Sequence, residues 1–478
     1  MFSQMGLITM NLSVRAFCSL AALALAMPVG AQAPAPRVTP VPLPTPAPAR
    51  GPADLLPSAS GNGANTVSQP VVQDIFDNAF QHRRPVVMQW DVRSAQALLA
   101  AIEGIGTEGL LPADYHPDSL RSAIAAGAGP ALDSRASEAF SWLVEDLRDG
   151  RTPMSSRRQW FVIDPDADVL PTGDLMEQAL QTGDIAGTLA SLNPTHPDYA
   201  VLKAEFARTP ESNRTRRATI RANMDRWRWL GRDLGVQYLI TNVPEYQLRL
   251  TVNDQIIRTY RTIVGKPGRT ATPQLAETVQ GVIFNPTWTV PQSIVKGEGL
   301  GNRVLNNPGW ARSHGYRGTR GENGYITVVQ QPGPGNSLGQ MKLDMPNPHA
   351  IFLHDTPSRQ LFAQDQRALS HGCIRTERAL ELAMTIAILG QGATREEAVQ
   401  ISTSGTYTRV PVVKTMPVYI TYFTMGRDID GQLRSFDDIY GRDAAVLASF
   451  NAPRVANRSR VPTEEAVEIV DDLQTDLT

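Results

Sequence analysis

The hydrophobic pattern of the chain changes once, and this change decides the class of fold. Up to about residue 230, apolar residues recur at the spacing of amphipathic helices. The segments with this spacing are 94–102, 118–126, 137–147, 174–192, 198–207 and 214–230. After Gly235 the pattern becomes one of short β-rich runs, at 236–243, 246–252, 255–265, 281–288, 325–331, 350–354 and 418–424. The sequence therefore predicts an α+β protein, with a helical domain at 71–230 and a mainly β, mostly antiparallel domain at 235–440.

Smaller features refine the predicted β domain. Asn253-Asp254 separates two β-rich runs and predicts a hairpin turn. Short helices are predicted at 376–389 and 395–401. The segment at about 293–323 is rich in Gly, Asn and Arg and is long for a connection, which is typical of a lid, a binding loop or a disordered insertion. We therefore expect an insertion here that caps a site.

The two ends of the chain have the composition of peripheral segments. Arg15 is the only charged residue among the first 36, and it precedes an apolar run. Ala31-Gln32-Ala33 then offers a small-x-small cleavage pattern, so residues 1–33 are predicted to be a signal peptide that directs export. A Pro/Ala-rich tract follows at 34–70 and is expected to be a semi-rigid linker. Residues 441–478 are predicted to form a C-terminal helix and an acidic tail.

The charge balance and the cysteine count exclude several classes of protein. Lys and Arg number 45 and Asp and Glu 47, which argues against a nucleic-acid partner because such proteins usually carry a basic excess. Two cysteines are too few for a disulfide framework or a four-cysteine zinc site. Cys18 lies in the predicted signal peptide, so the exported chain would keep one thiol, Cys373. An unpaired cysteine in an exported protein is either reactive or a buried, inert side chain.

The surroundings of Cys373 favour the reactive interpretation. A predicted strand ends at His354, fifteen residues follow, and then comes the hexapeptide Ser370-His371-Gly372-Cys373-Ile374-Arg375. A helix is predicted to begin near Thr376, so the thiol would lie just before a helix N-terminus, whose dipole favours a thiolate. Arg375 adds positive charge, and the histidines supply a base. Gly372 lets the backbone turn sharply and present N–H groups to an oxyanion.

Two alternatives at the same residues are weaker. His354, Asp355, His371 and Cys373 are possible zinc ligands, but adjacent residues of a strand point to opposite sides of the sheet, which gives a poor ligand set. Ser370 is a second possible nucleophile, although a thiol is intrinsically the better one, so Ser370 is expected to shape the turn. Neither a metal nor an organic cofactor is expected.

The sequence motifs of the chain resemble those of one enzyme family. His354, the fifteen-residue spacing and SHGCIR at 370–375 are similar to the signature of the YkuD-type L,D-transpeptidase catalytic domain. The surrounding LHDTPSRQLFAQDQRALSHGC, together with NPTWTVPQSI at 285–294 and MDRWRWL at 224–230, resembles the large periplasmic YcbB-type branch. GLLPADYHPDSL at 109–120 looks like the helical scaffold domain of that branch. Members usually carry a small peptidoglycan-binding module before the DRWRWL helix, and the chain from 206 to 221 has no room for it.

The resemblance implies a mechanism that centres on the thiol. Cys373 would be the nucleophile, and His354 would be the base that takes its proton. A backbone carbonyl near Asp355 would orient His354 through its other ring nitrogen. His371 would be the second histidine beside the thiol.

The resemblance also implies how substrate is bound. The N–H groups of Gly372 and Cys373 would form the oxyanion hole, and Arg375 would contact a carboxylate of the donor stem peptide. Asp355, Ser370 and Trp288 are further candidate substrate contacts, although an aromatic residue of a β domain such as Trp288 is more often part of the core. The expected partners are peptidoglycan stem peptides, a tetrapeptide donor and a diamino-acid acceptor, and possible cell-wall synthesis proteins.

The activity implied is the formation of 3→3 cross-links through a thioester on Cys373, with release of D-Ala. Acylation of the cysteine by carbapenems is implied as well. Other acceptors would make the protein an L,D-carboxypeptidase, an endopeptidase or a ligase that attaches a protein to peptidoglycan. A non-catalytic scaffold that binds the wall is the alternative of a different class.

Overall fold

The computed structural model describes residues 86–162, 166–456 and 459–464. The predicted signal peptide at 1–33, Cys18 and the linker at 34–70 lie outside the described residues. Most of the acidic tail, from residue 465, lies outside them as well. None of the described helices is both long enough and apolar enough to cross a membrane.

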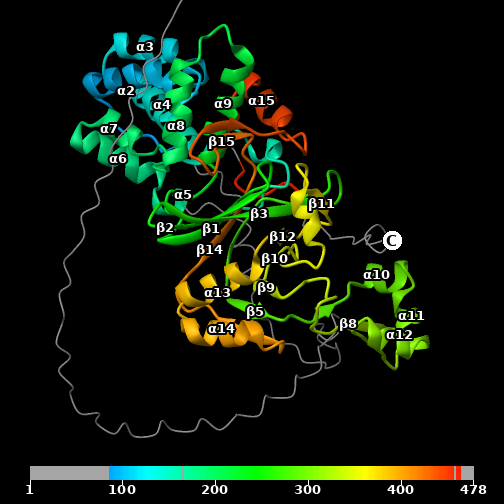
Figure 1. Ribbon diagram of the computed structural model, residues 1–478. Helices are drawn as coiled ribbons and strands as arrows, with labels where there is room; N and C mark the ends of the chain where they lie inside the picture. Colours follow the sequence, from blue (N-terminus) through cyan, green and yellow to red (C-terminus); the bar gives the residue numbers. More distant parts are fainter. Residues whose placement is uncertain (1–85, 163–165, 457–458, 465–478) are drawn as a thin grey trace, which may run out of the picture. The chain divides into compact units, whose positions relative to one another are not determined.

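Helices make up the N-terminal half, as the pattern predicts (Figure 1). They are α2 (Val92–Gly104), η2 (Ile105–Glu108), η3 (Pro112–Tyr115), α3 (Pro117–Ala126), α4 (Pro130–Asp149), η4 (Met154–Ser156), α5 (Asp166–Val169), α6 (Thr172–Thr182), α7 (Ile185–Ala190), α8 (Pro197–Arg208) and α9 (Arg214–Trp227). The apolar stripes of α2, α4, α6 and α7 meet in one core, in which Leu98, Phe140, Met176 and Leu189 are buried.

One predicted helix is in fact two. The segment 174–192 carries a helical pattern throughout, but the structure divides it into α6 and α7. Gly183 has a φ of +68°, a left-handed conformation that ends a helix at little cost when the residue is glycine. The Asp184 side chain then accepts a hydrogen bond from the Gly187 N–H, at 2.8 Å, and caps the next helix. Periodicity missed this break because the apolar spacing continues across it.

The second half is mainly β, as predicted. Its strands are β1 (Gln237–Asn242), β2 (Gln247–Val252), β3 (Gln255–Gly265), β4 (Leu275–Thr278), β5 (Gly281–Phe284), β6 (Trp288–Thr289), β7 (Tyr316–Arg320), β8 (Ile326–Gln330), β9 (Met341–Asp344), β10 (Leu353–His354), β11 (Ala368–Ser370), β12 (Ile374–Thr376), β13 (Thr408–Pro411), β14 (Pro417–Thr421), β15 (Met425–Arg427) and β16 (Leu433–Ser435). The largest sheet has the order β13-β5-β9-β10-β12-β3-β2-β1-β14-β4, with β11 paired to β3. Only β1 with β14, β10 with β12 and β11 with β3 are parallel among the described pairs.

The β domain also contains helices α13 (Ala379–Leu389) and α14 (Arg395–Thr403). Helix α13 packs on strands β5 and β9 and on α14. Asn253 and Asp254 have φ values of +48° and +57°, which is the conformation of a type I′ hairpin turn, as predicted. The run 281–288 is not one strand, because Asn285 has a φ of +49° and separates β5 from β6. A last helix, α15 (Asp443–Asn451), follows the β domain.

The insertion at about 293–323 is ordered rather than loop-like. It contains α10 (Gln292–Gly297), α11 (Leu300–Asn306) and α12 (Pro308–Ser313), and it packs on the small sheet β6-β8-β7 (Figure 1). Six buried residues form its own core: Val290, Ile294, Val295, Val304, Ala311 and Val328. The expectation of a loop or disordered segment was therefore wrong, because these few apolar residues are enough to hold three short helices on a hairpin.

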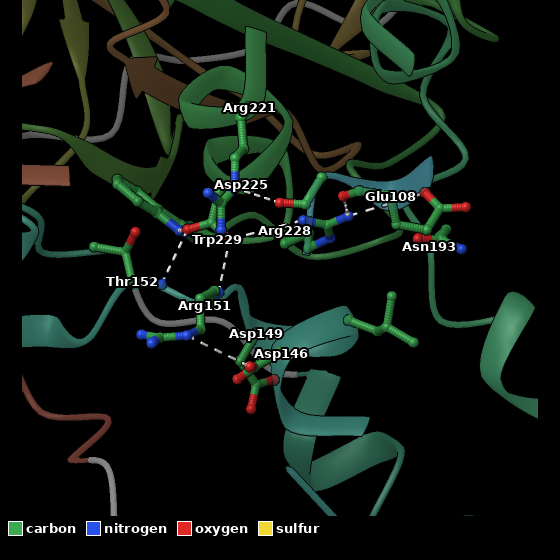
Figure 2. A network of polar contacts seen from close by, with 12 residues as sticks. Glu108, Asp146, Asp149, Arg151, Thr152, Asn193, Arg221, Asp225, Arg228 and Trp229 are labelled. Carbon is green, nitrogen blue, oxygen red and sulfur yellow. Dashed lines mark hydrogen bonds and ion pairs between the residues drawn. The ribbon is translucent and has the colours of Figure 1, made fainter. Parts of the chain in front are cut away.

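Buried hydrogen bonds join the turn after α4 to the C-terminal end of α9. Figure 2 shows the backbone N–H groups of Arg151 and Thr152 and the indole N–H of Trp229 converging on the Asp225 carboxylate, at 2.6, 3.1 and 3.0 Å. Asp225 and Arg228, which lies 3.7 Å away, are almost fully buried. Because all these partners are buried, the turn after α4 is fixed against the C-terminal end of α9.

Candidate active site

The sheet brings the two parts of the sequence motif together. Cys373 lies between β11 and β12, and β12 is paired in parallel with β10, which ends at His354. The pairing places Leu353 opposite Ile374 and His354 opposite Arg375. The fifteen residues between His354 and Ser370 therefore form a connection that returns to the neighbouring strand, with the thiol at its end.

The predicted helix N-terminus is not next to the thiol. Residues Ile374–Thr376 form strand β12, because their backbone pairs with β10 and β3, and α13 begins only at Ala379. A helix dipole acts on charges within its first turn, and the side chain of Cys373 is separated from α13 by the length of this strand. The expectation that the dipole favours the Cys373 thiolate was therefore wrong, and any stabilisation of the thiolate has another origin.

His354 is held as a neutral imidazole. Its Nδ1 lies 2.5 Å from the backbone carbonyl oxygen of Asp355, as the resemblance implies, so Nδ1 carries the proton and donates it. Burial, together with the positive charges of Arg375 and Lys342, lowers the pKa of His354 to about 3. The lone pair on Nε2 is therefore available to accept a proton throughout the physiological range.

Ser370 shapes the turn that presents the thiol. Its buried hydroxyl donates to the carbonyl oxygen of Cys373 at 2.6 Å and accepts from the Gly372 N–H at 3.2 Å. Gly372 has a φ of +119°, a conformation that favours glycine. The Gly372 N–H is therefore engaged within the turn, and the expected oxyanion hole of the Gly372 and Cys373 N–H groups stays a prediction.

Thr272 also holds this turn in place, and no sequence pattern indicated it. Its buried hydroxyl donates to the Gly372 carbonyl and accepts from the Gly265 N–H, each at 2.8 Å. The Tyr440 hydroxyl in turn donates to the Gly265 carbonyl at 2.5 Å. The end of β3 and the segment after β16 therefore both support the motif, although they lie about a hundred residues before it and some seventy after it in the chain.

The Cys373 thiol points to the turn before β10. Sγ lies 3.6 Å from the carbonyl oxygen of Ala350, and the side chain is partly exposed. Asn347 holds this turn, since its amide donates to the carbonyls of Met345 and Ile351 at 2.8 and 2.6 Å and its oxygen accepts from the Ile351 N–H. The alternative interpretation of Cys373 as a buried, inert side chain does not fit, because the thiol is partly exposed beside a turn.

Lys342 is a second residue that sequence reasoning missed. It lies on β9 directly opposite His354, and its Nζ is 4.0 Å from the centre of the Phe352 ring. Strand β9 was not among the predicted strands, because its four residues between a Gly-rich segment and Pro346 are too few for a clear alternation.

The other predicted site residues differ in their burial and in their contacts. His371 and Arg375 are buried beside Cys373 in the chain. Asp355 is buried and engaged, since its carboxylate accepts from the Gln340 N–H at 2.9 Å and lies 3.3 Å from Arg359. Trp288 packs against the core of the insertion at 293–323. Contact of any of them with substrate stays a prediction.

No group of three or more His, Cys, Asp or Glu side chains is arranged to hold a metal ion within the part of the chain that the structure describes. The zinc alternative therefore gains no support from the geometry.

Comparison with protein families assigns both halves of the chain. Residues 236–420 match the L,D-transpeptidase catalytic domain, and residues 86–206 match the scaffold domain. A curated protein of Haemophilus influenzae, named "Putative L,D-transpeptidase", is 31% identical over 229 residues, which are 45% of this chain and 46% of that protein. The chain thus spans about half the length of the curated relative that it matches.

Solved structures with some similarity are also L,D-transpeptidases. An enzyme from Mycobacterium smegmatis is 13% identical, over 39% of this chain and 58% of that one, with a TM-score of 0.21. L,D-transpeptidase 1 of Mycobacterium tuberculosis is 12% identical, over 39% and 61%, with a TM-score of 0.18.

The chain therefore carries the catalytic domain of a YkuD-type enzyme. More particularly, it combines a scaffold domain with an L,D-transpeptidase catalytic domain, which is the YcbB-type architecture that the sequence resembles. Enzymes with this catalytic domain act on peptidoglycan peptides and serve the cell wall.

Proposed function

We propose that the protein is a peptidoglycan L,D-transpeptidase that forms 3→3 cross-links through a thioester on Cys373. The observation that carries the proposal is the pairing of β10 with β12, which brings a neutral, backbone-anchored histidine and a partly exposed thiol to adjacent strands. A base and a nucleophile positioned in this way are what covalent acyl transfer requires.

In the first half of the reaction, Sγ of Cys373 attacks the carbonyl carbon of the third residue of a tetrapeptide stem. The thiol proton passes to Nε2 of His354, and the N–H of Cys373 donates to the developing oxyanion. The intermediate then breaks the bond to the terminal D-Ala, whose amine takes the proton from His354. The products of this half are free D-Ala and a thioester. Because Arg375 and Lys342 disfavour the protonated His354, it gives its proton readily to the leaving amine.

In the second half, the side-chain amine of a neighbouring stem attacks the thioester carbonyl. The new amide bond forms, the carbon–sulfur bond breaks, and the amine proton returns through His354 to the sulfur, so the resting thiol is restored. His371 supports the thiol, and Arg375 is proposed to bind a stem-peptide carboxylate through its forked donors. The capping insertion would cover the acceptor and exclude water.

Hydrolysis of the same thioester is the second candidate activity. The partial exposure of Cys373 favours it, since water has access to the thiol in this structure. With water as acceptor the protein would be an L,D-carboxypeptidase that releases a tripeptide.

We further propose that the protein acts in the periplasm after export. The support is the signal-like sequence at 1–33 and the substrate of the proposed reaction, which lies outside the cytoplasmic membrane.

Product analysis tests this function. Purified protein is incubated with disaccharide-tetrapeptides, and the products are separated and identified by mass spectrometry. A cross-linked dimer that has lost one D-Ala is expected, and the Cys373→Ala variant should give none. Tripeptide monomer alone would assign hydrolysis, and the same dimer from Cys373→Ala would overturn the proposal.

A further inference from the structure

Lys342 is placed to act on the reacting thiol. Strand β9 is antiparallel to β10, and Lys342 lies directly opposite His354. Directly opposed residues of an antiparallel pair send their side chains to the same face of the sheet. The neighbours of Lys342 on β9, Met341 and Leu343, are fully buried and therefore occupy the opposite face. Lys342 thus shares a face with the base of the proposed reaction.

The ammonium group is anchored at this position. Nζ lies 4.0 Å from the centre of the Phe352 ring, and that ring lies 5.5 Å from the imidazole of His354. A cation over an aromatic face is held by the charge distribution of the ring. Burial lowers the pKa of Lys342, and Asp344 and the thiolate form of Cys373 oppose that shift. Cys373 directly precedes β12, and Ile374 and Arg375 of β12 lie opposite Leu353 and His354 of β10. Since β10 lies between β9 and β12 in the sheet, the thiol lies one strand beyond the strand with which Lys342 pairs.

Arg375 and His371 also lie close to the thiol, whereas the other charged groups around it do not supply a positive charge. His354 is neutral, and Asp344 is 2.7 Å from Arg409, so its negative charge is largely compensated. Asp355 is paired with Arg359. Arg375, opposite His354 on β12, and His371, two residues before the thiol, are the remaining groups, and Arg375 has a proposed role in binding substrate. The helix dipole expected from the sequence is too distant.

We propose that Lys342 is a positioning residue that stabilises the negative charge of the Cys373 thiolate from the neighbouring strand β9. In a partly buried site such a charge is screened less than on the surface, so its effect on the thiolate is larger. This role rests on the proposed function of Cys373, to which β9 contributes a charge from outside the sequence motif.

The positive charge of Lys342 has two opposite effects on the reactivity of the Cys373 thiol, and an experiment can tell which one dominates. A positive charge favours the thiolate of Cys373, but it also disfavours protonated His354. If the first effect dominates, removal of the charge raises the pH at which the thiol ionises. If the second dominates, removal makes His354 a better base and the thiol becomes more reactive.

The test is the pH dependence of Cys373 alkylation by iodoacetamide, followed by intact-protein mass. The thiol loses its proton to solvent, and the thiolate then forms a carbon–sulfur bond and releases iodide, so no peptidoglycan substrate is needed. In Lys342→Met, which retains contact with Phe352, the midpoint should move up by about one pH unit, and the rate at pH 7 should fall by about tenfold. Lys342→Arg should restore most of the rate, and Lys414→Met, at an exposed position, should match the unmodified protein.

An unchanged midpoint, or one that moves to lower pH, in Lys342→Met would overturn the proposal. If this variant does not fold, Lys342→Gln is measured in its place, with thermal unfolding as the check on folding. Because alkylation does not depend on turnover, these outcomes are distinct from failure of the transpeptidase proposal, which would appear only in the product analysis.

Discussion

Replacement of His354 by alanine is expected to slow the release of D-Ala from a tetrapeptide by about 10²- to 10⁴-fold at pH 7, the usual contribution of a general base. The His354 imidazole has its Nδ1 anchored on the carbonyl oxygen of Asp355, which leaves Nε2 to accept the thiol proton. Without it, the thiol proton must pass to solvent, and the leaving amine has no donor. Steady-state kinetics measure the effect, with His116→Ala, on the exposed surface of the helical domain, as the matched control.

The pH dependence of the unmodified enzyme follows from the same side chain. Burial and the nearby cations lower the pKa of His354 to about 3, so the base form is retained as the pH falls from 8 to 5. The rate should therefore show no inflection near pH 6.5, where an ordinary histidine titrates. An inflection near 6.5 that disappears in His354→Ala would show that His354 titrates normally and would contradict the account of the site.

The second large effect concerns stability. Asp225→Ala is expected to lower the free energy of unfolding by about 3–5 kcal/mol, because it removes one partner of a buried ionic network and leaves the others without compensation. The carboxylate is fully buried and accepts from three N–H groups (Figure 2). Urea denaturation followed by circular dichroism measures the change, and Asp430→Ala, at an exposed turn, is the control.

The same network predicts how stability depends on pH. Burial alone raises the pKa of Asp225, but the charges of Arg228 and Arg157 and the Arg151 N–H lower it by more, so its pKa lies below the ordinary value of 3.8. A carboxylate of this kind contributes stability above its unfolded pKa and loses the contribution as the pH falls below about 4. Asp225→Ala should therefore reduce the acid sensitivity of unfolding. A loss of less than about 1 kcal/mol at pH 7, within the range of an exposed substitution, would contradict the structural role given to Asp225.

The sequence predicted the parts of the site that depend on local order. The strand ending at His354 and the return to Ser370-His371-Gly372-Cys373 could be inferred from spacing and resemblance, because these residues are close in the chain. The change from helices to strands near Gly235 was also visible, since periodicities of 3.6 and 2 differ over a few residues.

Other parts depend on long-range pairing and could not be predicted. Lys342 reaches the site only through the register of β9 with β10, and Thr272 only through its hydrogen bonds to Gly265 and Gly372. The position of α13 was misjudged for a related reason. Residues 374–376 are too short a run to predict a strand from sequence, and they form one because β10 and β3 pair with them on both sides. The fold of the capping insertion depends on six scattered apolar residues with no clear period.

The most direct test of the central claim is identification of the residue that becomes acylated. The protein is incubated with a carbapenem, its intact mass is measured, and the adduct is located by peptide mapping. The account predicts a mass increase equal to one carbapenem, located on Cys373 and absent in Cys373→Ala. An adduct on Ser370, or no adduct on the folded protein, would contradict the assignment of Cys373 as the nucleophile.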